Sequence, residues 1–276
     1  MAIDKRTLAT LALMLVAAAA VAIKYSDYLA NPWTRNGMVR ANVIQVTPRV
    51  SGPIVELPIR DNQEVKAGDL LFRIDPRTFK ADLDEAEAEL ERTREDFARA
   101  VDLVKKGDVS KRNYDKAEAA YDVAQADLET ARLNMEFTEV RASVDGYVTN
   151  LTLRIGSQAV ENQPVMALID RDSFWVHGFF RETSVGDINP GDQALVTLMS
   201  YPDTPLTGTV DSLGWGIAQQ DGASGVDLLP AVNPTFEWIR LAQRVPVRVH
   251  LDPLPEKVEL RVGTTASVLV KAESKD

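Results

Sequence analysis

The residues of this sequence form no constellation of the kind that carries out chemistry. The chain has no cysteine, which excludes thiolate catalysis, disulfides and cysteine-ligated zinc. Its two histidines, His177 and His250, both fall in alternating strand patterns and read as ordinary, partly buried side chains. Glu182 and Asp187 could pair on a short helix, but no nucleophile or set of metal ligands accompanies them. We therefore predict a protein that is not an enzyme and has no catalytic residue, metal site or cofactor.

The composition narrows the remaining classes of protein. The 276 residues carry 31 Lys and Arg against 41 Asp and Glu, a formal net charge of −10, and 45% of them are hydrophobic. This hydrophobic share indicates a folded chain, and the acidic balance argues against binding of nucleic acid. The length suits about two domains or one elongated chain of several modules.

The N-terminus has the pattern of a membrane anchor. Lys5 and Arg6 precede residues 7–23, which carry no charge and would form a helix of about 26 Å. Basic residues ahead of a transmembrane helix keep residues 1–6 in the cytoplasm as a short tail, with the rest of the chain across the membrane. A cleaved signal peptide and a buried soluble helix are the alternatives, because the segment has the minimum length for a span and is rich in alanine.

Two copies of an internal repeat lie in the first two-thirds of the chain. Residues 50–75 match residues 144–170 with one inserted residue, and each copy reads as short alternating strands separated by Gly or Pro. Neither copy can bury a core alone, so we predict that residues 47–75 and 144–170 face each other in one small β-sandwich. The identities include Val50/Val144, Gly52/Gly146, Leu57/Leu151, Arg60/Arg154, Val65/Val160, Ile74/Ile169 and Asp75/Asp170.

Residues 76–143, between the two copies, have a helical pattern instead. Apolar residues recur at alternating spacings of four and three on both sides of Gly107-Asp108, which predicts an antiparallel coiled-coil hairpin. Arms of about 30 residues would each reach about 45 Å. A pair of helices folded onto a globular body is the alternative. The seam positions are Phe79, Leu83, Ala86, Leu90, Thr93, Phe97, Ala100 and Val104, then Tyr114, Ala117, Tyr121, Ala124, Leu128, Ala131, Met135 and Thr138.

The charges of this hairpin are unevenly distributed. Residues 76–143 hold 17 acidic and 12 basic side chains, whereas residues 99–116 around the turn hold six cations and three anions. A basic tip on an acidic stem suits docking to an acidic partner surface. Solvated residues at an exposed loop are the alternative explanation.

The C-terminal part, residues 171–276, predicts a small β-barrel with one helical turn near residues 183–188. A loop at residues 214–238 interrupts it and is either a contact surface or an Ω-like excursion. Residues 24–46 read as a linker, in which residues 41–46 could add a strand to the barrel. The predicted strands cover residues 174–180, 193–198, 206–213, 244–251 and 265–270.

Together these features resemble the periplasmic adaptors, or membrane fusion proteins, of the HlyD type over essentially the whole chain. The resemblance implies a mixed, elongated, multi-module fold. Its parts would be an N-terminal transmembrane helix, a split biotinyl/lipoyl-like β-sandwich, a coiled-coil α-hairpin and a small β-barrel. Several stretches are similar to adaptor subunits of p-hydroxybenzoic acid (aromatic carboxylic acid) efflux pumps. They are residues 31–35 with 46–52, 181–183 with 190–191, and 237–250.

In this family, adaptors that dock TolC-like channels carry Arg, Leu and Ser near the hairpin tip with the spacing R-x3-L-x6-S. Arg99, Leu103 and Ser110 match that spacing, and the resemblance implies that they contact the periplasmic end of the channel. A lipoyl-like sandwich also raises the question of a carrier lysine. Here 68 residues replace the turn that would present it, so we expect no swinging-arm cofactor.

The resemblance implies an adaptor of a tripartite efflux pump, which links an inner-membrane transporter to an outer-membrane TolC-like channel and exports small compounds such as aromatic acids. The chain would cross the inner membrane once, with its bulk in the periplasm. Its other partners would be membrane lipid, through the N-terminal helix, and further copies of itself. An adaptor of an ATP-driven type I polypeptide secretion system is the first alternative, and a secreted structural or binding module is the second.

Overall fold

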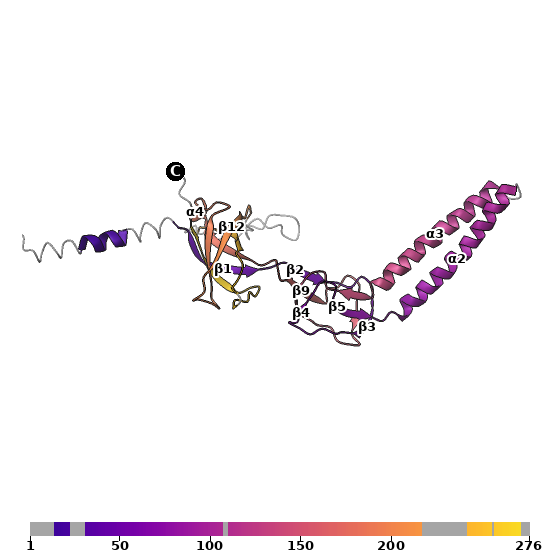
Figure 1. The fold of residues 1–276 in the computed structure, drawn as a ribbon, viewed down its shortest axis with the longest axis horizontal. Helices are drawn as coiled ribbons and strands as arrows, with labels where there is room; N and C mark the ends of the chain where they lie inside the picture. The colour runs from indigo at the N-terminus through magenta and orange to yellow at the C-terminus, as the bar shows by residue number, and fades with distance from the viewer. Residues whose placement is uncertain (1–13, 23–30, 107–109, 217–241, 256, 272–276) are drawn as a thin grey trace, which may run out of the picture. The chain divides into compact units, whose positions relative to one another are not determined.

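The computed structural model describes residues 14–22, 31–106, 110–216, 242–255 and 257–271 (Figure 1). The chain divides into two compact units, and it enters the first of them twice. Unit 1 comprises Met1–Ala41 with Ser173–Asp276, and unit 2 comprises Asn42–Asp172.

Unit 1 is built on a closed six-stranded barrel. Its strands alternate side chains inward and outward, and the inward positions are mostly β-branched, which suits a pleated, half-buried surface. The core includes Val39, Val176, Phe180, Val196, Val247, Val249 and Val268, each at most 1% exposed. All neighbouring strands are antiparallel. Around the barrel they are β1 (Trp33–Arg40), β10 (Trp175–Arg181), β13 (Arg244–Leu251), β12 (Leu206–Leu213), β11 (Gln193–Leu198) and β14 (Thr265–Lys271).

One end of this barrel carries the short helix α4 (Glu182–Val185), which follows β10 directly (Figure 1). The five strands that the C-terminal sequence pattern predicts therefore occur within a residue of the expected positions. The helical turn expected near residues 183–188 occurs as α4, Glu182–Val185, and ends three residues earlier. Most of the predicted loop 214–238 lies outside the described residues.

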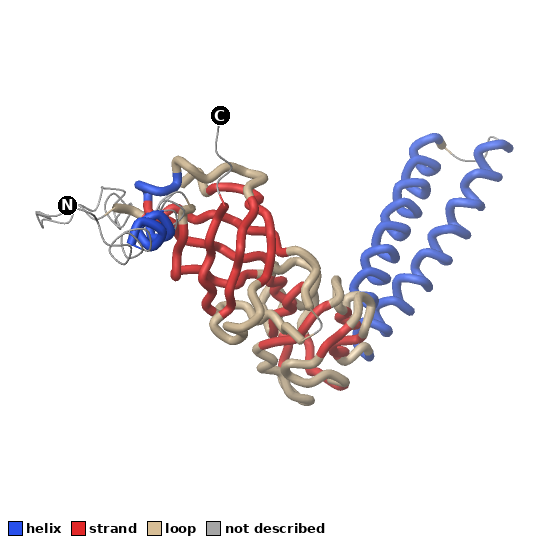
Figure 2. Tube along the Cα trace, turned by 60° about the vertical axis from the view of Figure 1, so that its left-hand side comes forward, coloured by secondary structure: helices blue, strands red, loops and turns tan. Residues whose placement is uncertain are grey.

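Unit 2 contains a sandwich of two four-stranded sheets, which Figure 2 shows as short strands linked by many loops. Each sheet takes strands from both copies of the internal repeat, so the copies interlock and share one core. The first sheet is β2 (Val43–Val46), β9 (Met166–Asp170), β7 (Gly146–Thr149) and β4 (Glu64–Val65). The second is β6 (Glu139–Arg141), β5 (Leu70–Ile74), β3 (Gly52–Glu56) and β8 (Gln158–Ala159).

Equivalent turns confirm that the two copies adopt the same conformation. In the first copy the Gln63 amide donates to the Arg60 carbonyl, and in the second the Ser157 amide donates to the Arg154 carbonyl. The residue before each of these donors has a positive φ, 62° at Asn62 and 86° at Gly156. Such left-handed positions favour Asn and Gly, which explains why both turns carry one of them.

The helical hairpin consists of α2 (Arg77–Lys106) and α3 (Lys111–Glu136), which run side by side in both views (Figures 1 and 2). It is inserted between β5 and β6, two strands that pair antiparallel, with Arg73 opposite Glu139. The Ile74 amide donates to the Thr138 carbonyl at 2.8 Å, so the chain leaves and re-enters the sandwich at adjacent points. The hairpin thus replaces the turn of a β-hairpin.

One prediction about the linker is wrong. Residues 41–46 were expected to add a strand to the barrel, but β2 (Val43–Val46) pairs with β9 in the sandwich. The barrel strand from this region is instead β1, which lies immediately before it. The reason is register: Val39 is buried in the barrel, whereas Ile44 and Val46 pack against the sandwich core.

The predicted anchor at residues 7–23 lies only partly within the described residues. Residues 14–22 are helical, and their apolar side chains are exposed, with Met14, Leu15, Val16 and Val21 at 68–71%. In the portion of the chain that is described, no helix combines the length and the apolar character needed to cross a bilayer.

Candidate functional site

The hairpin is held together by a seam in which the two helices bury each other. Thr93 on α2 is 3% exposed, and Ala124, Leu128 and Ala131 on α3 are at most 8% exposed. The Thr93 hydroxyl donates to the Glu89 and Leu90 carbonyls, at 2.9 and 3.0 Å, so it can be buried without an unsatisfied polar group. All four are seam positions of the heptad pattern, which confirms the predicted pairing of the arms.

Aromatic rings reinforce the distal part of the seam. The Phe97 ring stacks on Tyr121, with centroids 5.7 Å apart and an interplanar angle of 14°. It also contacts Tyr114 at 5.5 Å with a tilt of 53°. One α2 ring therefore contacts two α3 residues that lie two helical turns apart, and such contacts add stability beyond the apolar area that they bury. This cluster fixes the helices on the side of the hairpin nearer the tip.

The base of the hairpin is fixed to the sandwich. Phe79 near the start of α2 and Phe137 just after α3 both pack against the sandwich core. The Arg49 guanidinium lies 4.9 Å from the centre of the Phe137 ring, a distance typical of a cation–π contact. The two ends of the insertion are therefore anchored, while the residues between them pack chiefly on the opposite arm.

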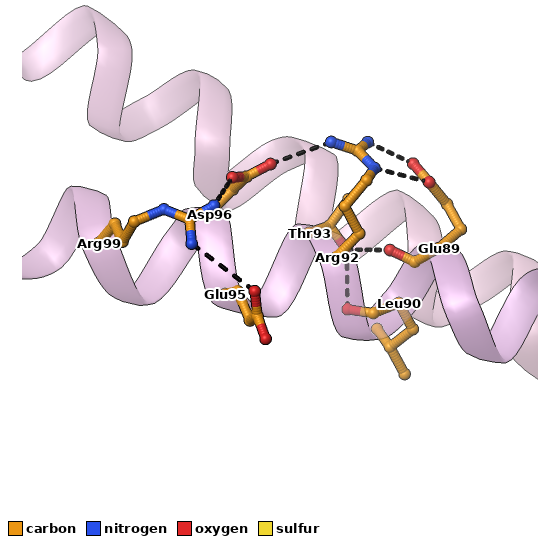
Figure 3. A network of polar contacts seen from close by, with 7 residues as sticks. All are labelled: Glu89, Leu90, Arg92, Thr93, Glu95, Asp96 and Arg99. Atoms are coloured by element: carbon orange, nitrogen blue, oxygen red, sulfur yellow. Dashed lines mark hydrogen bonds and ion pairs between the residues drawn. The ribbon is translucent and has the colours of Figure 1, made fainter.

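A row of charged residues runs along the exposed face of α2 towards the tip (Figure 3). Arg92 bridges Glu89 and Asp96, with N–O distances of 2.5 and 2.9 Å. Arg99 in turn pairs with Asp96 and, at 3.6 Å, with Glu95. These spacings of three and four residues place the partners on neighbouring turns, where ion pairs support an exposed helix.

The electrostatics of this row favour its ionised form. Hydrogen bonding from the Arg92 guanidinium lowers the pKa of Glu89 below its ordinary value, and the same bond raises the pKa of Arg92. Both groups are exposed, so solvent screens the pair and its effect on stability is small. The row therefore orders side chains along α2 rather than storing much energy.

The structure brings together two of the three predicted tip residues. Arg99 and Leu103 are four residues apart on α2, in the same exposed row as Arg92 and Asp96. The Arg99 side chain is 63% exposed and Leu103 is 39% exposed. Ser110 is on the other arm, across residues 107–109, which lie outside the described residues. It occupies the N-cap position of α3 but makes no side-chain capping hydrogen bond.

Several described cations surround these residues. Lys105, Lys111, Arg112 and Lys116 are all exposed, and Lys105 has Asp102 at 3.7 Å. Basic side chains therefore gather at the distal ends of both arms, as the sequence predicts. No group of three or more His, Asp or Glu in the described ranges is placed to hold a metal ion.

Sequence reasoning missed a second polar site, a groove at the end of the barrel beside α4. It is lined by Arg35, Arg181 and Arg244 from three separate segments, together with Asp187. Each of the three arginines lies in one of the stretches that resemble adaptors of p-hydroxybenzoic acid pumps, residues 31–35, 181–183 and 237–250. Their shared occurrence in those stretches was the available sequence signal for a common site. Pairing β10 with β13 in the correct register would have been needed to find the groove.

Comparison with known proteins identifies the family to which this chain belongs. Residues 42–171 match the family described as "RND MFP, barrel-sandwich hybrid domain", and residues 173–271 match the "AAEA-like beta-barrel domain". Over 259 residues the chain is 42% identical to the uncharacterized protein YdhJ of Escherichia coli strain K12, covering 89% of this chain and 90% of the relative. The chain belongs to the membrane fusion protein family, the adaptors of RND and HlyD type.

Solved structures agree with this assignment. A chimera of MacA that contains the α-hairpin domain of Pseudomonas aeruginosa MexA has a TM-score of 0.69 at 26% identity, over 88% of this chain and 83% of the chimera. The membrane fusion protein Spr0693 of Streptococcus pneumoniae R6 shares the fold, with a TM-score of 0.67 at 16% identity over 88% and 99%. Members of this family are non-enzymatic transport components, so the prediction that the chain is not an enzyme is confirmed.

Proposed function

We propose that this protein is the periplasmic adaptor of a tripartite efflux pump, linking an inner-membrane transporter to an outer-membrane channel. The observation that carries the proposal is the hairpin, whose two long helices bury mainly each other and present charged, exposed faces outside the seam. Such a hairpin buries little beyond its narrow seam, so its length and its exposed faces are available for contact with a partner. Membership of the membrane fusion protein family supports the same function.

The tip is the proposed contact with the channel. Arg99 offers a planar set of donors to carboxylate or carbonyl groups, and Leu103 beside it offers an apolar contact. Ser110 has a hydroxyl that does not cap its own helix, which leaves it available to a partner. A single tip is a small interface, so several copies arranged as a ring would bind the channel far more tightly than one.

The other parts of the chain have roles in the same proposed pump. The proposed anchor at residues 7–23 would hold the protein in the inner membrane and the barrel would contact the transporter. The lipoyl-like sandwich would line the conduit. The similarity of residues 31–35, 181–183 and 237–250 to adaptors of p-hydroxybenzoic acid pumps supports small aromatic acids as the exported compounds.

Replacing Arg99 with Asp tests the tip directly. The full chain would be crosslinked in cells through a photoreactive residue placed at Lys111, and the product with the outer-membrane channel quantified. We expect R99D to reduce this product at least tenfold and to lower tolerance of the exported acid. The physical reason is that the substitution removes the forked guanidinium donor, and the carboxylate that replaces it repels an acidic partner.

Arg94 provides a matched control on the same helix. Its side chain is 68% exposed and pairs with Glu91 at 3.5 Å, so R94D also breaks an intrahelical ion pair and reverses a charge. It lies farther from the tip and should leave crosslinking unchanged. Equal losses in R94D and R99D would show that helix disruption, not docking, is responsible, and that result would overturn the tip assignment.

Affinity purification of the full chain from membranes tests the class of pump. Recovery of a transporter without ATP-binding motifs, together with an outer-membrane channel, is the expected result. Recovery of a transporter with ATP-binding motifs would instead support the polypeptide-secretion alternative.

A further inference from the structure

The groove at the end of the barrel concentrates positive charge in an acidic protein. Arg35, Arg181 and Arg244 line it, and Asp187 is the only carboxylate among its described lining residues. None of the three arginines forms an ion pair within the described part of the chain, although the whole chain has a net charge of −10. The groove encloses about 660 Å³ and its walls are mostly polar, so it can admit a ligand group.

Two of these arginines face each other directly. In the antiparallel pairing of β10 with β13, Arg181 is opposite Arg244. The Glu182 amide donates to the Gln243 carbonyl at 2.9 Å, which makes the adjoining Arg181–Arg244 pair a non-hydrogen-bonded one. Facing side chains lie closest in pairs of that kind, and like charges there are destabilising. A bound anion would convert this repulsion into two sets of hydrogen bonds.

A β-bulge brings the third arginine to the same groove. The register between β1 and β14 shifts between Thr34 and Gly37, so Arg35 lies within a bulge, a device that re-aims side chains. Thr34 is 6% exposed, and its hydroxyl donates to the Phe179 carbonyl on β10 at 2.8 Å. The bulge is therefore tied to β10 two residues before Arg181. The three cations converge because local structure holds them there.

The short distance along the chain between the groove and the proposed membrane anchor indicates which anion the groove can reach. Asn31 lines the groove, and only nine peptide steps separate it from Ala22, the last residue of the described apolar helix. Nine steps span at most about 32 Å. If residues 7–23 lie in a bilayer, as the proposed function requires, the groove is tethered close to the lipid headgroups. Guanidinium groups bind phosphate oxygens through paired, charge-assisted hydrogen bonds.

We propose that this groove binds the phosphate of an anionic phospholipid, with Arg35, Arg181 and Arg244 donating to its oxygens. The inference rests on the proposed function only for the membrane location of residues 7–23. Lipid bound there would fix the barrel relative to the membrane surface. Headgroup charge would then influence how the barrel is presented to the transporter.

The test uses the full chain in nanodiscs that contain equal amounts of phosphatidylglycerol and phosphatidylcholine. Native mass spectrometry of the protein released from the discs counts the lipids that it retains. We expect the wild type to retain phosphatidylglycerol preferentially, and the combined variant R35Q/R181Q/R244Q to retain the two lipids equally. A variant that keeps the wild-type preference would overturn the proposal.

A control variant separates the groove from general loss of charge. R40Q/R248Q/R261Q removes three exposed arginines from the same unit, none of which lines the groove, and should keep the preference for phosphatidylglycerol. Equal loss in both triple variants would show non-specific attraction and would overturn the proposal. In lipid-free detergent, R181Q should melt at or above the wild-type temperature because it removes the opposed charges. A clear fall in that temperature would indicate a structural arginine instead.

Two further outcomes identify other ligands. If inorganic phosphate raises the melting temperature of the wild type while phosphatidylglycerol is not enriched, the groove takes free phosphate and the lipid assignment is wrong. If the groove variant loses the co-purifying transporter but keeps its lipid preference, the groove is a protein interface and the proposal is also wrong. Lipid retention does not depend on the hairpin tip, so a failed R99D experiment would overturn only the tip assignment. Recovery of neither a transporter nor an outer-membrane channel in the affinity purification would refute the efflux function separately.

Discussion

Two repeated glycines show how single residues determine the sandwich. Gly52 and Gly146 are identical positions of the internal repeat, and each lies against a repeated isoleucine. A Cβ at Gly52 would lie 2.6 Å from the Ile74 Cγ2 atom, and a Cβ at Gly146 would lie 2.0 Å from the Ile169 carbonyl oxygen. Both copies therefore have a glycine where a neighbouring strand approaches closely, although the atom met is a side-chain methyl in the first copy and backbone in the second.

The two sites should respond differently to alanine. Gly146 meets backbone, which cannot move without breaking the β7–β9 pairing, whereas Gly52 meets the end of a side chain. We expect G146A to destabilise the sandwich by about 3 kcal/mol and G52A by about 1 kcal/mol, measured by urea unfolding. At Gly186 the added Cβ would have no atom within 4 Å, so G186A is the control and should change little. Equal effects at Gly52 and Gly146 would contradict this argument.

The helical hairpin depends on a narrow seam, so its stability is concentrated in a few contacts. Phe97 joins two turns of α3 through Tyr114 and Tyr121, whereas the flanking faces are charged and exposed. An isolated pair of helices with such a seam gains little elsewhere. Loss of the aromatic contacts should therefore affect the distal half of the hairpin before the base.

Truncation of Phe97 tests this dependence. We expect F97A to lower the local stability of the distal arms by about 2 kcal/mol, less than for a fully buried phenylalanine because the ring is half-buried. Hydrogen exchange of α2 and α3 amides would show faster exchange near the tip and unchanged exchange in the sandwich. V123A, at a side chain 61% exposed on α3, is the control. Faster exchange throughout the sandwich would mean that the two parts unfold together.

The row of charged residues on α2 predicts that the stability of the hairpin depends on pH. Arg92 lowers the pKa of Glu89 in the folded chain, so the pair contributes stability above the ordinary glutamate pKa. This contribution is lost as the pH falls through the lowered pKa. Between pH 7 and pH 3 the wild type should therefore lose slightly more thermal stability than E89Q. E118Q on α3 should behave as the wild type, and an identical loss in E89Q would contradict the role of the pair.

At the scale of the whole molecule, the hairpin is an insertion rather than a support. The strands β5 and β6 pair directly, and the Ile74 amide reaches the Thr138 carbonyl across the insertion. A short turn could therefore connect these strands without moving them. The sandwich core is made mainly of residues from the two repeats. The flanking segments add Ile44, Val46, Val140 and Ala142, and the hairpin base adds Phe79 and Phe137.

Excision of the hairpin tests this independence. We replace residues 77–136 with an Asn-Gly turn, which suits a two-stranded connection. The remaining chain should keep cooperative unfolding of the sandwich, because its core strands are intact. It should still associate with the inner-membrane transporter but lose the outer-membrane channel in co-purification. A shortened chain that fails to fold would show that the hairpin supports the sandwich.

Local patterns in the sequence were enough to predict several elements. The heptad spacing located both helical arms, because a helix that buries one narrow stripe must repeat every three or four residues. Alternation located the five C-terminal strands, and the repeat identities predicted that the two β copies form one unit. Arg99 and Leu103 were correctly placed on one helix near the tip, although their contact with a channel remains a prediction.

Tertiary structure alone decided how distant segments combine. The sequence pattern predicted residues 41–46 as a strand of the barrel, and only the pairing of β2 with β9 assigned them to the sandwich. The groove of Arg35, Arg181 and Arg244 depends on a bulge in β1 and on the register of β10 with β13. Periodicity specifies which face of a strand is buried, but it does not specify the neighbouring strand. That choice depends on contacts between residues far apart in the chain, such as the bond from Thr34 to Phe179.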